Sequence, residues 1–308
     1  MTTSLQLPLV GPGGEAVDLA RTLNSHGFAE LAPSSLDEAA NTLSVTVRVP
    51  GTRPRRIRIG PDASGSVARV DVLGTTAGPR VRAAALAGAA HVLRLDHDLS
   101  AFYELIGDDP DLAWATRGAG RMLRSPTVFE DVVKTICTTN CAWGATVRMV
   151  NTLVSSLGEP AIGGDGPLTN SFPTPGAMAA APESFYRDVV RAGYRSPYLI
   201  ELARRVDAGE ADLEELATTG GSLVSDDDVE QTLLALPGIG PYAAAHVMMT
   251  LGRNSRLILD SWTRPKYARL IGHSKRVPDA TITRRFRRYG DHAGLAFWLF
   301  LTRDWVED

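Results

Sequence analysis

The stretch Leu236-Pro-Gly-Ile-Gly-Pro-Tyr242 decides the fold of this 308-residue chain. It joins an acidic segment that ends near Ala235 to an apolar segment that begins at Pro241, and both have helical spacing. Two glycines around one apolar residue predict a tight turn, and a proline at the first helical position loses no hydrogen bond. The uncovered backbone N–H groups at the start of the second helix form an anion site suited to a phosphate. An ordinary turn between two helices is the structural alternative.

A single carboxylate follows this hairpin. In Leu257-Ile-Leu-Asp260-Ser-Trp-Thr-Arg264, Asp260 ends an apolar run and stands directly before a basic helical segment. A helix N-terminus stabilises an anion at such a position, so a purely structural N-cap is one interpretation. The other is a functional carboxylate at the mouth of a site between the hairpin and a second lobe.

The hydrophobic period changes along the chain. Residues 43–50, 55–59 and 67–73 alternate apolar and polar side chains between turns that contain Gly or Pro, which predicts an antiparallel sheet with one solvated face. A short helix is expected over 17–25, and the period beyond Pro79 is helical. The predicted fold class is α+β, with a small antiparallel sheet in a strand-rich N-terminal domain (1–80). A two-lobed, all-helical body (81–308) follows, with the hairpin over 226–251 and the second lobe completed by 90–125 and 260–308.

The composition excludes several classes of protein. The apolar runs are too short for a membrane span, and no basic leader begins the chain, so a cytoplasmic protein is expected (nucleoid-associated if the source is bacterial). Two cysteines, Cys137 and Cys141, cannot supply a four-cysteine cluster. The net charge of −3 argues against a nucleic-acid partner, but residues 240–290 hold eleven Lys/Arg against two acids. This clustering of positive charge in one segment favours a protein with one side facing DNA. A basic helix face that is only solvated is the common alternative.

The hairpin and the Asp260 segment together resemble the signature of the helix-hairpin-helix (HhH-GPD) DNA glycosylase superfamily. The resemblance favours the alkylpurine and 8-oxoguanine branch, which has no iron–sulfur cluster. Further segments that occur in the family's order are Arg94–Asp96, Ser125–Glu130, Ile136–Asn140, Phe172–Pro175 and Ala192–Arg195, so the resemblance covers about 85–303. It implies a monomeric base-excision-repair enzyme that acts on double-stranded DNA containing a damaged base, with no required cofactor.

The resemblance also implies roles for individual residues. Asp260 matches the catalytic aspartate, which stabilises an oxocarbenium-like sugar and positions water. Tyr242 stands where bifunctional members carry a Schiff-base lysine, so a monofunctional glycosylase is implied. The implied base pocket comprises Tyr242, His246, Trp262 and His292. The implied DNA contacts are Asn140, Tyr194, Arg195, Pro237, Gly238, Ile239, Gly240 and Arg264. A structural K⁺ or Na⁺ would be held by the carbonyls of Leu234, Leu236 and Ile239.

Among the implied DNA contacts, Asn140 would fill the void that the flipped nucleotide leaves and Tyr194 would act as a wedge. Arg195 would contact the orphaned base, but a second arginine of the 8-oxoguanine enzymes is replaced by Ala145. An alkylated purine is the expected substrate, because a cationic base stacks on aromatic faces and is already a good leaving group. An 8-oxoguanine-type or other modified base is the alternative. A hairpin DNA-binding protein without catalysis is another.

Overall fold

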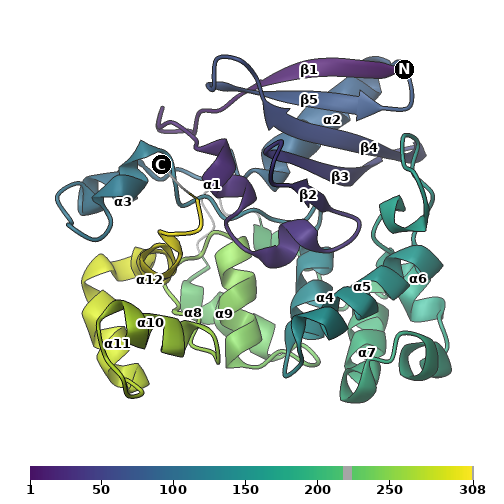
Figure 1. The fold of residues 1–308 in the computed structure, drawn as a ribbon. Helices are drawn as coiled ribbons and strands as arrows, with labels where there is room; N and C mark the ends of the chain where they lie inside the picture. Colours follow the sequence, from purple (N-terminus) through teal and green to yellow (C-terminus); the bar gives the residue numbers. More distant parts are fainter. Residues whose placement is uncertain (218–223, 307–308) are drawn as a thin grey trace.

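The α+β fold class is confirmed by the computed structural model, which describes residues 1–217 and 224–306. Figure 1 shows a sheet at one end of the molecule and a body of helices beneath it. The last two residues of the predicted body, 307–308, lie outside the described residues. None of the described helices is both long enough and apolar enough to cross a bilayer.

The sheet is antiparallel and has five strands in the order β1-β5-β4-β3-β2. The strands are β1 (Thr2–Pro8), β2 (Ser35–Asp37), β3 (Thr42–Val49), β4 (Thr52–Pro61) and β5 (Val67–Leu73). Cross-strand pairs such as Leu43 with Ile59 and Val45 with Ile57 align the apolar sides of β3 and β4, which fixes their register. Sequence alternation predicted the three central strands. It missed the edge strands β1 and β2, which bury little side-chain area.

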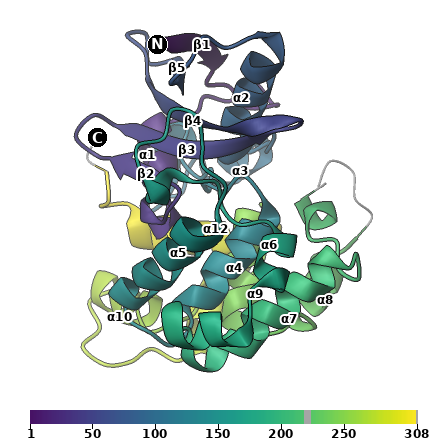
Figure 2. The same cartoon turned by 90° about the vertical axis from the view of Figure 1, so that its right-hand side faces the viewer.

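Two helices complete the hydrophobic core beneath the sheet: α1 (Leu19–Leu23) and α2 (Pro79–Val92). Ala85, Ala89 and Val92 face the sheet one helical turn apart and are completely buried there. Figure 2 shows from the side that the sheet and α2 lie above α4, α5 and α6.

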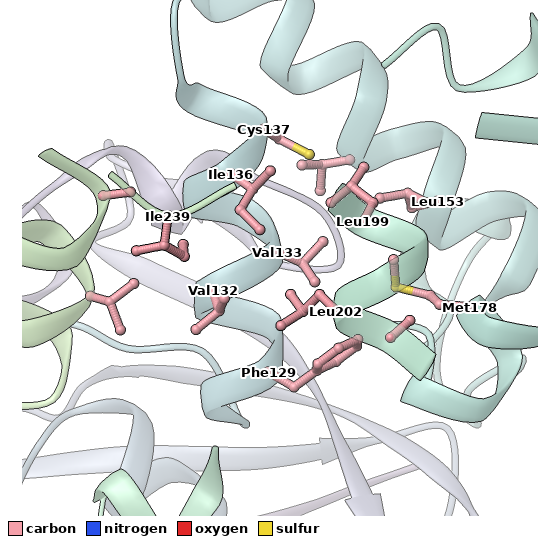
Figure 3. Packing of buried hydrophobic residues seen from close by; sticks show 14 of the residues in the cluster. Phe129, Val132, Val133, Ile136, Cys137, Leu153, Met178, Leu199, Leu202 and Ile239 are labelled. Carbon is pink, nitrogen blue, oxygen red and sulfur yellow. The ribbon is translucent and has the colours of Figure 1, made fainter. Parts of the chain in front are cut away.

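The first helical lobe contains α4 (Val128–Thr138), α5 (Trp143–Leu157), α6 (Pro175–Ala180) and α7 (Ser196–Asp207). Figure 3 shows Val132, Val133, Ile136 and Cys137 of α4 pointing into its core. All residues of α4 from Val128 to Cys137 are buried, including the ion pair between Glu130 and Lys134, so α4 is central to the lobe. Cys137 is a packing residue there, as its helical spacing predicted.

The second lobe contains α3 (Ser100–Ile106), α10 (Thr263–Leu270), α11 (Asp279–Phe286) and α12 (Ala293–Thr302). Every residue of α12 is buried, because the helix is apolar on all sides and runs through the core. Shorter helical turns connect the main elements: η1 (Gly27–Glu30), η2 (Ala113–Arg117), η3 (Pro167–Thr169), the π-helix η4 (Phe185–Val189), η5 (Gly193–Arg195), η6 (Glu214–Ala217) and η7 (Arg287–His292).

The predicted hairpin is formed by α8 (Asp226–Leu234) and α9 (Pro241–Thr250), which lie between the two lobes (Figure 1). Tyr242 at the start of α9 packs against the cores of both lobes. At the other end of α9, the buried guanidinium of Arg94 donates hydrogen bonds to the carbonyls of Thr250 and Leu251, both at 2.8 Å. A cation at a helix C-terminus is electrostatically favourable, so Arg94 fixes the position of α9.

Candidate active site

A cavity of about 1410 Å³ opens where the hairpin, both lobes and the N-terminal segment meet. Its wall includes most of the residues that the sequence assigned to a site. These are Asn140, Tyr194, Gly238, Ile239, Gly240, Tyr242, His246, Asp260, Trp262 and Arg264. The cavity therefore joins segments more than 100 residues apart in the sequence at one place.

The hairpin turn depends on Gly238. Its φ of 78° is in the left-handed region, and an added Cβ would lie 2.9 Å from the Cβ of Tyr198. Gly240 is the N-cap of α9 and supplies no side-chain hydrogen bond, while Pro241 begins the helix. The first N–H groups of α9 are therefore not capped by a side chain at the mouth of the cavity, which suits an anion.

Asp260 is held by the backbone that follows it. Its Oδ1 accepts hydrogen bonds from the N–H groups of Trp262 (2.8 Å) and Thr263 (2.6 Å). The hydroxyl of Thr263 accepts one in return from the N–H of Asp260, at 2.8 Å. Both interpretations of the sequence are therefore compatible, because one carboxylate oxygen caps the start of α10 while the residue lines the cavity.

Tyr242 and His246 lie one helical turn apart on α9. The phenol of Tyr242 lies 3.4 Å from the hydroxyl of Thr138, and burial raises the pKa of Tyr242, with a further increase from the charge of Asp260. Burial, followed by the charge of His26, lowers the pKa of His246 to about 3. Both side chains are therefore neutral at pH 7. His246 is only 7% exposed, and neither of its ring nitrogens has a hydrogen-bond partner in the described chain.

The N-terminal segment contributes His26 and Phe28, which the sequence did not identify. The rings of both contact His246, with centroids 5.9 Å and 5.1 Å away, and both residues line the cavity. His26 donates from Nε2 to the carbonyl of Leu123 at 2.5 Å and accepts the N–H of Phe28 at Nδ1, at 3.3 Å. Both of its nitrogens are occupied, and burial lowers its pKa to about 4. No local motif marks these residues, because only the tertiary fold brings them to α9.

Three tryptophans form an aromatic wall beside Asp260. The rings of Trp262, Trp298 and Trp305 pack on one another with centroids 5.5 to 6.0 Å apart. Trp262 and Trp305 are 38% and 41% exposed, so an edge or face of each is open to the cavity. The sequence placed only Trp262 at the site.

The turn between α4 and α5 carries Asn140, whose φ is 45°. Its side-chain amide donates to the hydroxyl of Tyr194 at 3.2 Å, and both side chains are exposed. Arg195 differs from its implied role, because it is only 6% exposed and does not line the cavity. Its guanidinium donates to the carbonyl of Thr139 and lies 4.5 Å from the centre of the Tyr194 ring. Arg195 thus holds the turn from beneath and is not free to contact an opposing base.

Two further residues lie outside the cavity, and the base-pocket role implied for His292 needs correction. His292 is not among the residues that line the cavity; its half-buried ring lies 5.2 Å from that of Phe102, a residue of the second lobe's core. Pro237 faces a separate hollow that includes Tyr198. The DNA contact implied for Pro237 stays a prediction, because a hollow outside the cavity is compatible with it. Arg264 does line the cavity, but its guanidinium is held by both carboxylate oxygens of Asp279, at 2.8 and 2.9 Å.

The three carbonyls implied for a monovalent cation lie on the hairpin, at Leu234, Leu236 and Ile239. The carbonyl of Leu236 accepts the N–H of Ile239 at 3.3 Å, which closes the turn. Carbonyl oxygens are suitable ligands for a hard cation, so these residues fit the ion chemically. In residues 1–217 and 224–306, no group of three or more His, Cys, Asp or Glu side chains could hold a metal ion.

The chain is similar in fold and in sequence to known DNA glycosylases. The α+β fold matches that of solved DNA glycosylases, and the similarity to glycosylases predicted from the motifs is confirmed. A 3-methyladenine DNA-glycosylase from Archaeoglobus fulgidus superposes with a TM-score of 0.73 at 20% identity, over 98% of this chain and 99% of that one. No protein-family model matches the chain.

Two curated relatives are similar in sequence. The chain is 30% identical over 158 residues to an N-glycosylase/DNA lyase of Saccharomyces cerevisiae, a match that covers 49% of this chain and 42% of that protein. It is 28% identical over 166 residues to a DNA-3-methyladenine glycosylase of Bacillus subtilis, over 50% of each. The matches thus span about half the length of these relatives.

Proposed function

We propose that the chain is a monofunctional DNA glycosylase of base excision repair. It binds duplex DNA, flips a damaged base into the cavity and hydrolyses the N-glycosidic bond, leaving an abasic site. The observation that carries this proposal is Asp260, a carboxylate at the edge of a cavity large enough for a nucleotide, next to a hairpin with uncapped N–H groups. The similarity to named glycosylases supports the same activity.

The chemistry follows from the residues around Asp260. Two N–H groups hold Oδ1, so the carboxylate has a fixed orientation while its negative charge faces the cavity. As the glycosidic bond breaks, positive charge develops on the sugar, and a preorganised carboxylate stabilises that charge and orients the attacking water. Asp260 acts on the sugar and the water, and the base departs with its bonding electron pair.

The lysines near the site do not favour a covalent mechanism. Tyr242 cannot form a Schiff base, and Lys134 and Lys266 are each held in an ion pair, with Glu130 at 2.7 Å and Asp304 at 2.6 Å. The third lysine of the sequence, Lys275, lines a separate hollow that borders Asp260 and does not line the cavity. A lysine nucleophile needs a free, deprotonated amine. These contacts support hydrolysis by water.

We further propose that the substrate is an alkylated purine. The charge of Arg264 in the cavity wall is neutralised by Asp279, and His246 and His26 are neutral, so little positive charge opposes a cationic base. The cavity also offers the electron-rich faces of Trp262 and Trp305. A cationic base is attracted to such faces and needs no protonation to depart. The buried, unpaired nitrogens of His246 would bind the edge of the base.

Asn140 and Tyr194 would occupy the space vacated by the flipped nucleotide, since both are exposed and joined by a hydrogen bond at the rim of the cavity. The hairpin carbonyls of Leu234, Leu236 and Ile239 would hold K⁺ or Na⁺ beside a DNA phosphate. Replacing these ions with tetramethylammonium, which is too large for such a site, should weaken binding to DNA.

The test is excision from a panel of duplexes that carry alkylated, oxidised or undamaged purines, read by alkaline cleavage of abasic sites. Alkylated purines should be excised fastest, and Asp260→Asn should lower the rate by about 100-fold or more. Asparagine still caps the helix, so α10 should remain folded. The exposed Asp108→Asn is the matched control and should keep full activity. Full excision by Asp260→Asn would refute the mechanism, and binding without any excision would favour a non-catalytic hairpin protein.

A further inference from the structure

A second hollow, of about 500 Å³, also borders Asp260. It shares Asp260, Ser261 and Arg264 with the large cavity, so the two meet at the carboxylate. Its remaining wall is formed by α10 and the loop that follows: Pro265, Ala268, Arg269, His273, Ser274, Lys275 and Arg276. The hollow has no role in the function proposed above.

Three cations at this hollow are not in ion pairs. Arg269, Lys275 and Arg276 are exposed, and none forms a salt bridge with an acid in residues 1–217 or 224–306. Asp279 lies within electrostatic reach of Arg276, but both of its carboxylate oxygens are already bound by Arg264.

Several other cations of the basic segment 240–290 differ from these three, because they are paired with acids. Arg253 and Arg256 form salt bridges with acids at the start of α8, and Lys266 with Asp304. Only part of the basic segment therefore keeps its charge for a ligand, and three of those charges surround one hollow. Such a convergence of positive charge suits an anion with oxygen acceptors.

The position of the hollow indicates which anion. A nucleotide with its base in the large cavity and its sugar at Asp260 has a phosphodiester on each side of that sugar. The uncapped N–H groups of α9 lie on the cavity side of Asp260 and suit one of the two. The hollow borders the carboxylate of Asp260 as well, and it suits the other phosphodiester.

We propose that Arg269, Lys275 and Arg276 bind the second phosphodiester that flanks the flipped nucleotide, the one not held by the hairpin. The inference rests on the proposed function, since it requires the lesion strand to pass Asp260. The two phosphate sites then hold the strand on both sides of the sugar. This arrangement fixes the glycosidic bond over the carboxylate and leaves the rotation of the base free.

The first experiment measures the salt dependence of binding to a duplex that contains a stable abasic-site analogue, by fluorescence anisotropy. The variant Lys275→Gln/Arg276→Gln should bind about tenfold more weakly at low salt, and the slope of log K against log salt should decrease by about one. The matched control is Arg58→Gln/Arg80→Gln, which removes the same charge from the sheet end of the molecule (Figure 1) and should leave the slope unchanged. Equal losses in the two variants would overturn the proposal.

The second experiment locates the contact. One flanking phosphodiester at a time is replaced by a neutral methylphosphonate, in the same duplex. At one of the two positions the replacement should weaken DNA binding by the wild-type protein about tenfold. Binding by the Lys275→Gln/Arg276→Gln variant should not change there, because the variant has already lost the contact. If the affinities of both proteins fall by the same factor at both positions, the hollow does not bind a flanking phosphodiester.

These readouts use no excision, so the two proposals fail separately. Full excision by Asp260→Asn would refute the catalytic mechanism and leave the phosphodiester site supported by the binding data. Normal excision with additive methylphosphonate effects would refute only the phosphodiester site. A wild-type protein that does not bind the abasic duplex would refute both.

Discussion

His246→Leu should make the protein more stable and less active at the same time. His246 is 7% exposed, and both ring nitrogens lack a partner in the described chain. An unsatisfied buried polar group costs about 1–3 kcal/mol, and leucine fills a similar volume without polar atoms. The free energy of unfolding should therefore rise by about 1–3 kcal/mol at pH 7.

The gain in unfolding free energy from His246→Leu should be larger at lower pH. Burial lowers the pKa of His246 from 6.5 to about 3 in the folded protein. Between these values the unfolded chain binds a proton and the folded chain does not, so stability is lost as the pH falls below about 6.5. At pH 5 this loss is about 2 kcal/mol for one such residue. Leucine does not titrate, so the advantage of the variant should widen by about 2 kcal/mol from pH 7 to pH 5.

Urea denaturation followed by circular dichroism at the two pH values measures both quantities. His273→Leu removes an exposed histidine and should change the stability by less than about 0.5 kcal/mol at either pH. Excision by His246→Leu should fall about tenfold or more, since 1.4 kcal/mol of lost interaction with the base is a factor of ten. A variant that is less stable than wild type at pH 7, or whose advantage is the same at both pH values, would refute the reasoning.

Three other outcomes are expected. Arg195→Ala should slow excision about tenfold whichever of the four bases stands opposite the lesion, because the guanidinium supports the Thr139 carbonyl. A loss of activity confined to one opposite base would instead support direct contact with that base. Gly238→Ala should lower the unfolding free energy by about 1–3 kcal/mol and weaken DNA binding, since the turn has a positive φ and the new Cβ would meet Tyr198; calorimetry with unchanged stability would contradict this. Borohydride should trap no covalent complex with lesion DNA, because Tyr242 replaces the lysine; a trapped band on a denaturing gel would show lyase chemistry.

Counts of charged residues along the sequence predicted only part of the charge distribution on the folded protein. The excess of Lys and Arg over residues 240–290 predicted a single DNA-facing side. In the structure the acids of α8 lie against part of that segment: Arg253 bridges Asp226, and Arg256 bridges Asp227 and Glu230. The acidic and basic segments thus partly neutralise each other, which no count along the chain could reveal. Three of the charges that form no salt bridge within residues 1–217 and 224–306 lie at the hollow beside Asp260: Arg269, Lys275 and Arg276.

Local chemistry by itself determined the hairpin and the position of Asp260. The turn needs a left-handed glycine, a proline at the first helical position and an acid before the next helix, and each requirement involves only neighbouring residues. The helical period likewise predicted the helices of the body, because one turn of helix brings residues four apart onto one face.

Only the tertiary structure decided which side chains surround Asp260. His26 and Phe28 reach the cavity, and Arg195 is buried beneath its turn instead of facing DNA. These positions depend on packing between segments more than 50 residues apart, for which the local sequence carries no signal. The same packing removes water from His246, and this desolvation is what makes a histidine on α9 a neutral, unpaired group at the wall of the cavity.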